Sequence, residues 1–301
     1  YGTPGCGKSY YVEHTLLKDY RHNEEGLCID AIRTTFYQDY SNSDFVGQIM
    51  PIVKSDKSVS YEFIPGPFAL ALNKAIQNVD KPIALVIEEL NRGNAASIFG
   101  DIFQLLDREN GTSVYSITNV NIQKYLEEQN PNYSFNYIKI PSNLSIIATM
   151  NTSDQNVYTL DTAFKRRWKF EKLQNVFTEE HEYANWYIPG MNRTWKDFCN
   201  TINNFIIESS DEITNSEDKQ LGVYFVDKNG LREKSIDPTN EKDIKEFAYK
   251  VFEYLWDDVM KISKDTMFKN TKSLDELINT YVEKGQANKG EEVFVDNFFK
   301  T

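Results

Sequence analysis

The stretch that decides the fold is GTPGCGKS, residues 2 to 9. Its spacing is that of a phosphate-binding loop, G-x-x-x-x-G-K-[ST], with both glycines, the lysine and the serine in register. In such a loop the backbone N–H groups turn toward an anion, the lysine adds positive charge, and the serine hydroxyl suits Mg²⁺. We therefore expect nucleotide to be bound by Gly2, Thr3, Pro4, Gly5, Cys6, Gly7, Lys8, Ser9 and Tyr10, with Ser9 also a metal ligand.

The residues that flank this loop fit the same interpretation. Apolar side chains recur after Ser9 at helical spacing, which predicts a helix whose positive N-terminal end faces the anion. The alternative is a chance glycine-rich turn, which the complete motif disfavours. A phosphate loop normally follows a buried strand, and Tyr1 alone precedes this one. We therefore expect that strand to lie upstream of the sequence given.

A second segment, KPIALVIEELNRGN (residues 81–94), supplies acidic side chains. The apolar run from Ile83 to Ile87 is typical of a strand buried on both faces of a parallel sheet. It ends on Glu88 and Glu89, and two carboxylates there are costly unless they face a cation or a polarised water. We expect Glu88 to support Mg²⁺ and Glu89 to act as general base for an attacking water. The alternative is a solvated strand end.

A third segment, TMNTSDQNVYTLDTAFKRRW (residues 149–168), follows another apolar run. Leu144 to Thr149 is expected to form the strand between the phosphate-loop strand and the acidic strand. Its carboxyl end would then point at the γ-phosphate. Asn151 can hydrogen-bond the attacking water or that phosphate, and Asp154 can help to orient the water.

The same segment closes on two adjacent arginines, Arg166 and Arg167. They lie far along the chain from the phosphate loop, so we expect them to reach the nucleotide of a neighbouring subunit. There a guanidinium stabilises the charge of the transition state. The alternative is a solvated basic end of a helix, which the helix dipole favours.

Composition sets broader limits. A chain of 301 residues that is 40% hydrophobic can bury one large or two modest cores. The formal net charge of -12 disfavours a stand-alone nucleic-acid binder. Three cysteines in separate contexts indicate reduced thiols, and no membrane-length run or signal-peptide pattern is present, so a cytoplasmic protein away from membranes is expected. We find no nuclease pattern of the form Asp…Glu-x-Lys.

The rest of the chain indicates an α/β core with a parallel sheet flanked by helices, followed by a mainly helical lid. We place the nucleotide-binding core at residues 1–172 and the lid at residues 173–301. Apolar periodicity predicts helices over 94–108, 194–208, 241–262 and 274–283. A hairpin is expected over residues 113–122, and a short strand and turn over residues 220–230. The aromatic side chains of the lid are expected to be core.

Taken together, the phosphate loop, VIEELNRGN, TMNTSDQNVYTLDTAFKRRW and TTFYQDYSNSDFVGQIMP resemble the McrB family of AAA+ proteins. Its name-giving member is the GTP-hydrolysing motor of a modification-dependent restriction system. The resemblance is close over residues 1–172 and loose beyond. Two departures are Glu88, where AAA+ proteins more often have Asp, and Cys6 in the phosphate loop. The first implies a different Mg²⁺ geometry or a water between.

This resemblance implies Mg²⁺-dependent hydrolysis of GTP or ATP, a ring of subunits such as a hexamer, and a separate McrC-like nuclease. It also implies that DNA is bound by a domain upstream or by the partner. Two other functions stay open. One is a protein-remodelling ATPase like the MoxR relatives, and the other is a nucleotide-locked scaffold that assembles but barely turns over.

Overall fold

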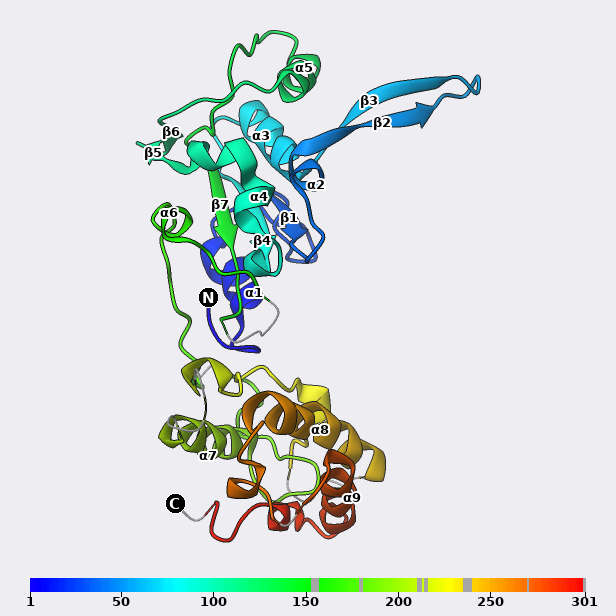
Figure 1. Cartoon of the computed structure of the whole chain (residues 1–301), viewed down its shortest axis with the longest axis vertical. Helices are drawn as coiled ribbons and strands as arrows, with labels where there is room; N and C mark the ends of the chain where they lie inside the picture. Colours follow the sequence, from blue (N-terminus) through cyan, green and yellow to red (C-terminus); the bar gives the residue numbers. More distant parts are fainter. Residues whose placement is uncertain are drawn as a thin grey trace. The chain divides into compact units, whose positions relative to one another are not determined.

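The computed structural model describes residues 1–152, 157–178, 181–209, 213, 216–234, 240–269 and 271–299 (Figure 1). The chain divides into two compact units. The first contains Tyr1 and Lys8–Glu171, and the second contains Gly2–Gly7 and Lys172–Thr301. Most of the phosphate-loop motif therefore groups with the C-terminal unit, while its lysine and serine begin the first. None of the helices that the structure describes combines the length and apolar character that a membrane span requires.

The first unit is built on a parallel sheet. Among the described residues its strands run in the order β1 (Ala31–Thr35), β4 (Ile83–Glu88) and β7 (Leu144–Ala148). The two strands expected from the apolar runs are confirmed, whereas β1 was not predicted. Glu88 pairs with Thr35 of β1, and Ile87 with Ala148 of β7. The residues that follow β4 and β7 therefore meet at one edge of the sheet.

The central strand β4 is apolar throughout because both of its faces are covered. Ile83, Leu85 and Ile87 belong to the main hydrophobic cluster of this unit. Ala84 and Val86 point the other way, into a second cluster that includes Val12 and Leu17. This alternation follows from the two-residue period of a strand. It fixes β4 in position and thereby fixes the carboxylates at its end.

The helices of the first unit are mostly short. They are α1 (Lys8–Tyr11), which runs on through a π-helical segment (Val12–Leu16), α2 (Asn42–Val46), α3 (Pro67–Gln77), α4 (Ala95–Phe99), α5 (Val120–Gln129) and α6 (Thr162–Lys165). 3₁₀ segments cover Leu90–Arg92 and Gly100–Leu106. The helix predicted over residues 94–108 is thus divided, because Gly100 takes a positive φ of 51°. Its start is as expected: the Asn94 side chain accepts a hydrogen bond from the backbone of Ser97.

The hairpin predicted over residues 113–122 is wrong. A small hairpin lies earlier, between β5 (Arg108–Glu109) and β6 (Thr112–Ser113). The later part of the predicted hairpin begins α5 instead. There the Asn119 side chain accepts from the backbone N–H of Ile122 and caps the helix. Ile122 and Leu126 are then buried one turn apart, a helical spacing that the apparent alternation concealed.

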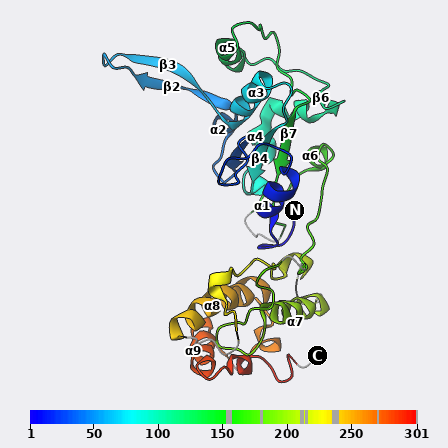
Figure 2. The ribbon, with the colours of Figure 1, turned by 180° about the vertical axis from the view of Figure 1, so that it is seen from behind.

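A long hairpin joins α2 to α3. Its strands are β2 (Gly47–Val53) and β3 (Val59–Pro65), and it projects away from the sheet of the first unit, as the views from the front and from behind show (Figures 1 and 2). Several of its apolar side chains face solvent, with Val53 70% and Tyr61 75% exposed. A two-stranded ribbon has no second layer to cover them.

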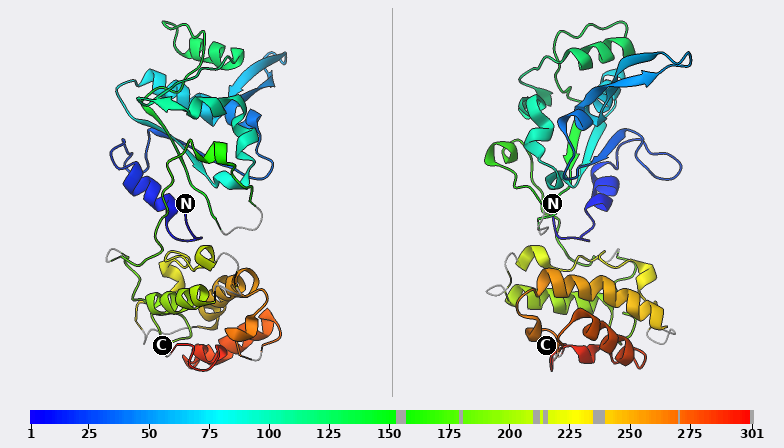
Figure 3. Two further views of the ribbon diagram at one scale, coloured as in Figure 1. Left: turned by 60° about the vertical axis from the view of Figure 1, so that its left-hand side comes forward. Right: turned by 45° about the vertical axis from the view of Figure 1, so that its right-hand side comes forward.

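The second unit is helical. Its elements are α7 (Trp195–Glu208), α8 (Glu241–Glu253) with a π-helical continuation (Tyr254–Val259), α9 (Leu274–Gly285), and 3₁₀ segments at Ser216–Lys219, Lys228–Gly230, Lys264–Thr266 and Gly290–Val293. Helices α8 and α9 lie side by side (Figure 3). The aromatic side chains pack as core, as expected, and Trp195 and Tyr281 are fully buried. The strand predicted within residues 220–230 is wrong, because residues 221–227 have no regular secondary structure.

Candidate functional site

Glu88 is the centre of the first polar cluster at the carboxyl edge of the sheet. Ser9 Oγ donates a hydrogen bond to Glu88 Oε2 over 3.3 Å, and Thr149 Oγ1, just after β7, donates to the same oxygen. The other oxygen, Oε1, accepts from Arg33 Nη1 at 3.2 Å. The structure therefore brings together the two residues predicted to serve Mg²⁺, Ser9 and Glu88. The structure also places Arg33 and Thr149, which were not predicted, beside Glu88.

Glu89 forms the second cluster. It has a left-handed backbone, with φ 56° and ψ 45°, at the start of the 3₁₀ turn Leu90–Arg92. A non-glycine residue in this region stores strain of about 1–3 kcal/mol, and such strain concentrates at functional sites. Asn151 Nδ2 lies 2.9 Å from both carboxylate oxygens, and Arg92 Nε lies 3.2 Å from Oε2. Two residues that were predicted separately, Glu89 and Asn151, are therefore in direct contact.

Asn91 ties the two loops of this edge together. Its Nδ2 donates to the carbonyl of Asn151 at 2.6 Å, and its own carbonyl accepts from the backbone of Tyr158 at 2.7 Å. Asn91 and Asn151 are 5% and 8% exposed. The Oδ1 atom of each is buried and has no hydrogen-bond partner within the described residues. Buried acceptors of this kind are costly unless a donor such as water reaches them.

The phosphate loop is shaped by its glycines. Gly5 and Gly7 have φ values of 76° and 89°, which side chains rarely adopt. The backbone N–H of Tyr224 donates to the Gly5 carbonyl at 2.8 Å. A Cβ on Gly222 would stand 2.2 Å from the Pro4 oxygen, so the loop lies directly on residues 222–225 of the same unit. Of the remaining motif residues, Thr3 and Cys6 are buried, Lys8 is half-buried, and Ser9 and Tyr10 are exposed.

These donors fit a magnesium–nucleotide complex. Among the residues that the structure describes, no group of three or more His, Cys, Asp or Glu side chains is placed to hold a metal alone. Mg²⁺ does not need one, because it usually takes one or two protein oxygens together with phosphate oxygens and water. Ser9 Oγ and Glu88 Oε2, 3.3 Å apart, are such a pair of oxygens.

The two arginines differ in their surroundings. Arg167 Nη2 pairs with Asp107 at 2.6 Å, and the arginine side chain is 9% exposed. Its guanidinium also lies over the ring of Phe103, 4.1 Å from the centroid. Arg166 is exposed. Asp154, the remaining predicted residue, lies outside the described residues.

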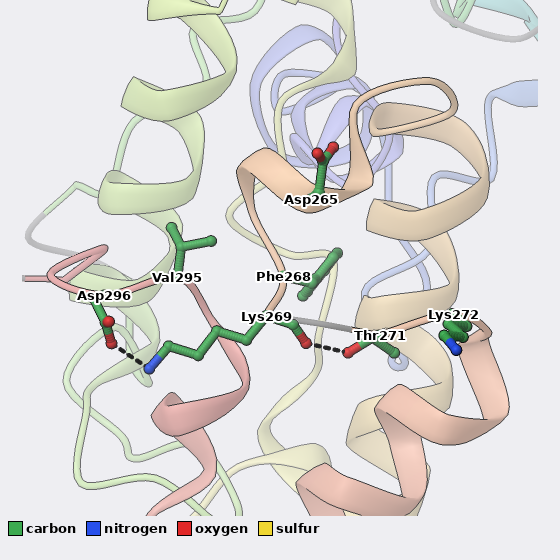
Figure 4. A pocket seen from close by; sticks show the side chains of 7 residues that line it. All are labelled: Asp265, Phe268, Lys269, Thr271, Lys272, Val295 and Asp296. Atoms are coloured by element: carbon green, nitrogen blue, oxygen red, sulfur yellow. Dashed lines mark hydrogen bonds and ion pairs between the residues drawn. The ribbon is translucent and has the colours of Figure 1, made fainter.

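One cavity of the C-terminal unit lies apart from all predicted site residues. It measures about 480 Å³ and is lined by Asp265, Phe268, Lys269, Thr271, Lys272, Val295 and Asp296 (Figure 4). Lys269 pairs with Asp296 across it, and the Thr271 hydroxyl donates to the Lys269 carbonyl at 2.6 Å. Lys269, Thr271 and Asp296 are thus engaged with one another.

A phosphate-loop motif, a parallel sheet and a carboxylate pair beside an asparagine define a class, the P-loop NTPases of the AAA type with an α/β core and a helical C-terminal region. The model of the protein family described as "AAA domain (dynein-related subfamily)" matches residues 1–168. The chain belongs to this family.

Two curated relatives narrow the assignment. The Bacillus subtilis (strain 168) protein "Type II restriction enzyme BsuMI component YdiS" is 36% identical over 93% of this chain and 84% of its own length. The Escherichia coli (strain K12) "Type IV methyl-directed restriction enzyme EcoKMcrB subunit" is 25% identical over 58% of this chain and 35% of its own length. The resemblance to the McrB family is therefore confirmed. A solved structure of a candidate ATPase from Cytophaga hutchinsonii covers 99% of this chain and 72% of its own, with 14% identity and a TM-score of 0.35.

Sequence reasoning missed Arg33, Thr149 and Arg92 as members of the site. Arg33 carries a weak signal, since it is a charged residue inside the strand-like run AIRTT. Thr149 was assigned only as the end of a strand. Arg92 was noted only as part of a family motif. Arg33 and Thr149 are recognised once the register of the sheet is known, and Arg92 once the 3₁₀ turn Leu90–Arg92 is known.

Proposed function

We propose that this chain is the nucleotide-hydrolysing motor subunit of a restriction complex, with Mg²⁺ and GTP or ATP as its substrate complex and a separate nuclease subunit as its partner. The observation that carries the proposal is the convergence at the sheet edge. Glu88 is within reach of Ser9, and Glu89 is held by Asn151 at 2.9 Å. The names of the two curated relatives support the restriction role.

Each residue has a role in this proposal. Lys8 and the backbone of Gly2–Gly7 bind phosphates, and Ser9 and Glu88 hold the metal. Mg²⁺, when bound, offsets phosphate charge and aligns the γ-phosphate for displacement. Glu89 accepts a proton from the attacking water, and Asn151 orients Glu89 and that water. The buried Oδ1 of Asn151, which has no hydrogen-bond partner among the described residues, is a suitable acceptor for it.

One observation favours a second function, a nucleotide-locked scaffold with little turnover. Both carboxylates at the sheet edge are paired with arginines, Glu88 with Arg33 and Glu89 with Arg92. A carboxylate that is held by a guanidinium is less free to contact an attacking water. In the motor proposal the pairing of Glu89 with Arg92 is released when subunits assemble or when the partner binds.

A turnover assay separates the two functions. Phosphate release is measured with GTP and with ATP, for the chain alone and with the proposed nuclease partner. The motor proposal expects turnover with one nucleotide and stimulation by the partner. Binding without turnover under all four conditions would leave the scaffold as the better function, and dependence on a protein substrate instead of the nuclease would favour a remodelling ATPase.

A further inference from the structure

Arg33 lies between two carboxylates of the first unit. Its Nη1 is 3.2 Å from Glu88 Oε1, and its Nη2 donates to Glu13 Oε2. The three side chains come from different elements, namely β1, β4 and the π-helical segment after α1. The carboxylate side chains are 18% and 11% exposed, against 37% for the arginine. One guanidinium therefore serves two largely buried acids.

Glu13 is anchored independently of Glu88. Its Oε1 accepts the backbone N–H of Cys28 at 2.7 Å, and His22 Nε2 lies 3.7 Å from the same oxygen. A carboxylate held in this way fixes the direction from which the guanidinium approaches. The geometry thus directs Arg33 onto Oε1 of Glu88 rather than onto the other oxygen.

The two oxygens of Glu88 consequently have different partners. Oε1 is taken by Arg33, while Oε2 faces the hydroxyls of Ser9 and Thr149. Ser9 is the residue that the phosphate-loop motif assigns to Mg²⁺. Oε2 of Glu88, which Arg33 does not contact, therefore lies beside Ser9, the other residue proposed to bind the metal.

We propose that Arg33 is a positioning residue that acts as the built-in counter-ion of Glu88, offsetting its charge when no divalent cation is bound and turning Oε2 toward Ser9. This inference rests on the proposed role of Glu88 in metal binding. Because Arg33 and a divalent cation are attracted by the same carboxylate, they oppose each other electrostatically. Removing the arginine charge should therefore strengthen the binding of a bare cation.

The test is a titration of the nucleotide-free chain with Mn²⁺, followed by the electron paramagnetic resonance signal of the free ion. Arg33→Gln should bind Mn²⁺ on the order of tenfold more tightly than the unmodified chain. Arg33→Lys keeps the charge and should stay near the unmodified value. The matched control is Arg193→Gln, which removes a guanidinium paired with the exposed Glu291 at 2.9 Å in the C-terminal unit, and it should leave Mn²⁺ affinity unchanged. Equal or weaker binding by Arg33→Gln overturns the proposal.

Thermal unfolding gives a second readout. Without divalent cation, Arg33→Gln should unfold at a lower temperature, because Glu13 and Glu88 are left unpaired. Mn²⁺ should raise its midpoint more than that of the unmodified chain, since a ligand that binds only the folded chain stabilises it by RT ln(1 + [L]/Kd), which grows as Kd falls. If Arg33 were purely structural, Arg33→Gln would lower the unfolding midpoint by the same amount at every Mn²⁺ concentration.

Two further variants keep the test decisive. If Arg33→Gln does not fold, Glu13→Gln leaves Arg33 to Glu88 alone and should weaken Mn²⁺ binding; unchanged or tighter binding contradicts the inference. Glu88→Gln tests the metal-binding role of Glu88 separately from the role of Arg33. If Glu88→Gln binds Mn²⁺ as the unmodified chain does, the metal role of Glu88 fails and the inference with it. If it binds weakly while Arg33→Gln is unchanged, only the role of Arg33 fails.

Discussion

At the scale of single residues, Glu89 has the strained backbone and the double contact with Asn151 that a held proton acceptor requires. Glu89→Gln keeps the shape and removes the basicity. We expect nucleotide binding to change little and hydrolysis to fall by about 10²-fold or more, the usual effect of losing a general base. Phosphate release and equilibrium binding of a labelled nucleotide measure the two effects.

Two comparisons make this prediction specific. Lys8→Ala should weaken nucleotide binding itself, because the lysine charge meets the phosphates before any reaction. Glu62→Gln, on the exposed hairpin, is a matched loss of one carboxylate and should leave both measurements unchanged. Turnover near the unmodified rate in Glu89→Gln would exclude Glu89 as the base.

His181 predicts a dependence of stability on pH. It is 6% exposed, and aromatic rings surround it, among them Tyr183 and Tyr224 with centroids 4.6 Å from its own. Burial lowers the pKa of His181, although the carbonyl of Val223 accepts from its Nε2 at 3.1 Å. The folded chain therefore keeps this histidine neutral while the unfolded chain takes up a proton below its ordinary pKa of about 6.5. Stability should consequently fall as the pH decreases from about 6.5 toward the lowered pKa.

The measurement is the unfolding midpoint between pH 7.5 and pH 5. His181→Gln can still donate to Val223 but cannot take up a proton, so its midpoint should fall less over this range. His14→Gln removes an exposed histidine and should follow the unmodified chain. Identical pH profiles for His181→Gln and the unmodified chain would show that another group controls the effect.

Residues of the candidate site could be predicted where a motif names them. The spacing of the phosphate loop and the acids after an apolar run led to Ser9, Glu88, Glu89 and Asn151, and the structure places them in two contacting groups. Arg33 could not be found in this way. Its role depends on the register of β1 against β4, and on a π-helical segment that brings Glu13 to the same point. No local sequence pattern predicts either feature.

At the scale of elements, local sequence patterns again predicted only part of the structure. Runs that are buried on both faces, such as β4, and wide amphipathic stripes, such as α7 to α9, could be read from periodicity. The predicted helix over residues 94–108 was interrupted by one glycine with positive φ. The predicted hairpin over residues 113–122 was wrong because a capping asparagine favoured a helix over the alternation. Local backbone geometry thus determined the secondary structure at the two places where the apolar pattern alone was ambiguous.

The segment Gly222–Phe225 has no regular structure, yet it supports the phosphate loop. A Cβ on Gly222 would stand 2.2 Å from the Pro4 oxygen and from the Gly5 carbonyl carbon, so Gly222→Ala must displace the loop. We expect nucleotide affinity to fall by about tenfold or more, since the loop N–H groups lose their alignment on the phosphates. Titration with a fluorescent nucleotide measures it.

The matched control is Gly230→Ala. A Cβ there would meet one methyl group of Val226, which can move, and it lies on the same segment of the C-terminal unit. Its nucleotide affinity should stay within about twofold of the unmodified value. Equal affinities for the two variants would mean that the loop tolerates displacement and that its contact with residues 222–225 has no part in binding.

The end of α6 yields a prediction that separates its two arginines. Arg167→Ala removes a guanidinium that is paired with Asp107 and stacked on Phe103, and it should lower the stability of the first unit by about 1–3 kcal/mol. Arg166→Ala removes an exposed side chain and should change stability by less than about 0.5 kcal/mol. Thermal unfolding compares them. Equal destabilisation by both would remove the distinction, and Arg166 would lose its place as the candidate that acts on a neighbour.

At the scale of the whole molecule, the net charge of -12 bears on how a restriction complex could use this chain. A surface of this sign repels the DNA backbone, so contact with DNA is expected through other parts of the complex. Under the proposed function, the chain contributes a cycle of nucleotide binding and hydrolysis instead. In an assembly of such subunits, an arginine from one chain can complete the hydrolytic site of its neighbour.

Mixing experiments test whether Arg166 is that residue. An assembly made only of Arg166→Ala subunits should bind nucleotide and hydrolyse little, and one made only of Glu89→Gln subunits should also be nearly inactive. Mixed assemblies contain interfaces where an intact Glu89 site meets an intact Arg166 from the next subunit. Activity should therefore return in the mixture. An arginine supplied in this way is worth about 10³- to 10⁵-fold in GTPases, so even a minority of repaired interfaces would stand above background.

The same reasoning requires activity to depend on assembly. Near the assembly threshold, hydrolysis per chain should rise with protein concentration, because each complete site needs two subunits. Mass measurements on the same samples establish which assemblies form. If mixed assemblies form and stay as inactive as either parent, Arg166 does not act across an interface. The exposed basic end of α6 is then a solvated helix terminus whose charge complements the helix dipole, and the hydrolytic site is complete within one chain.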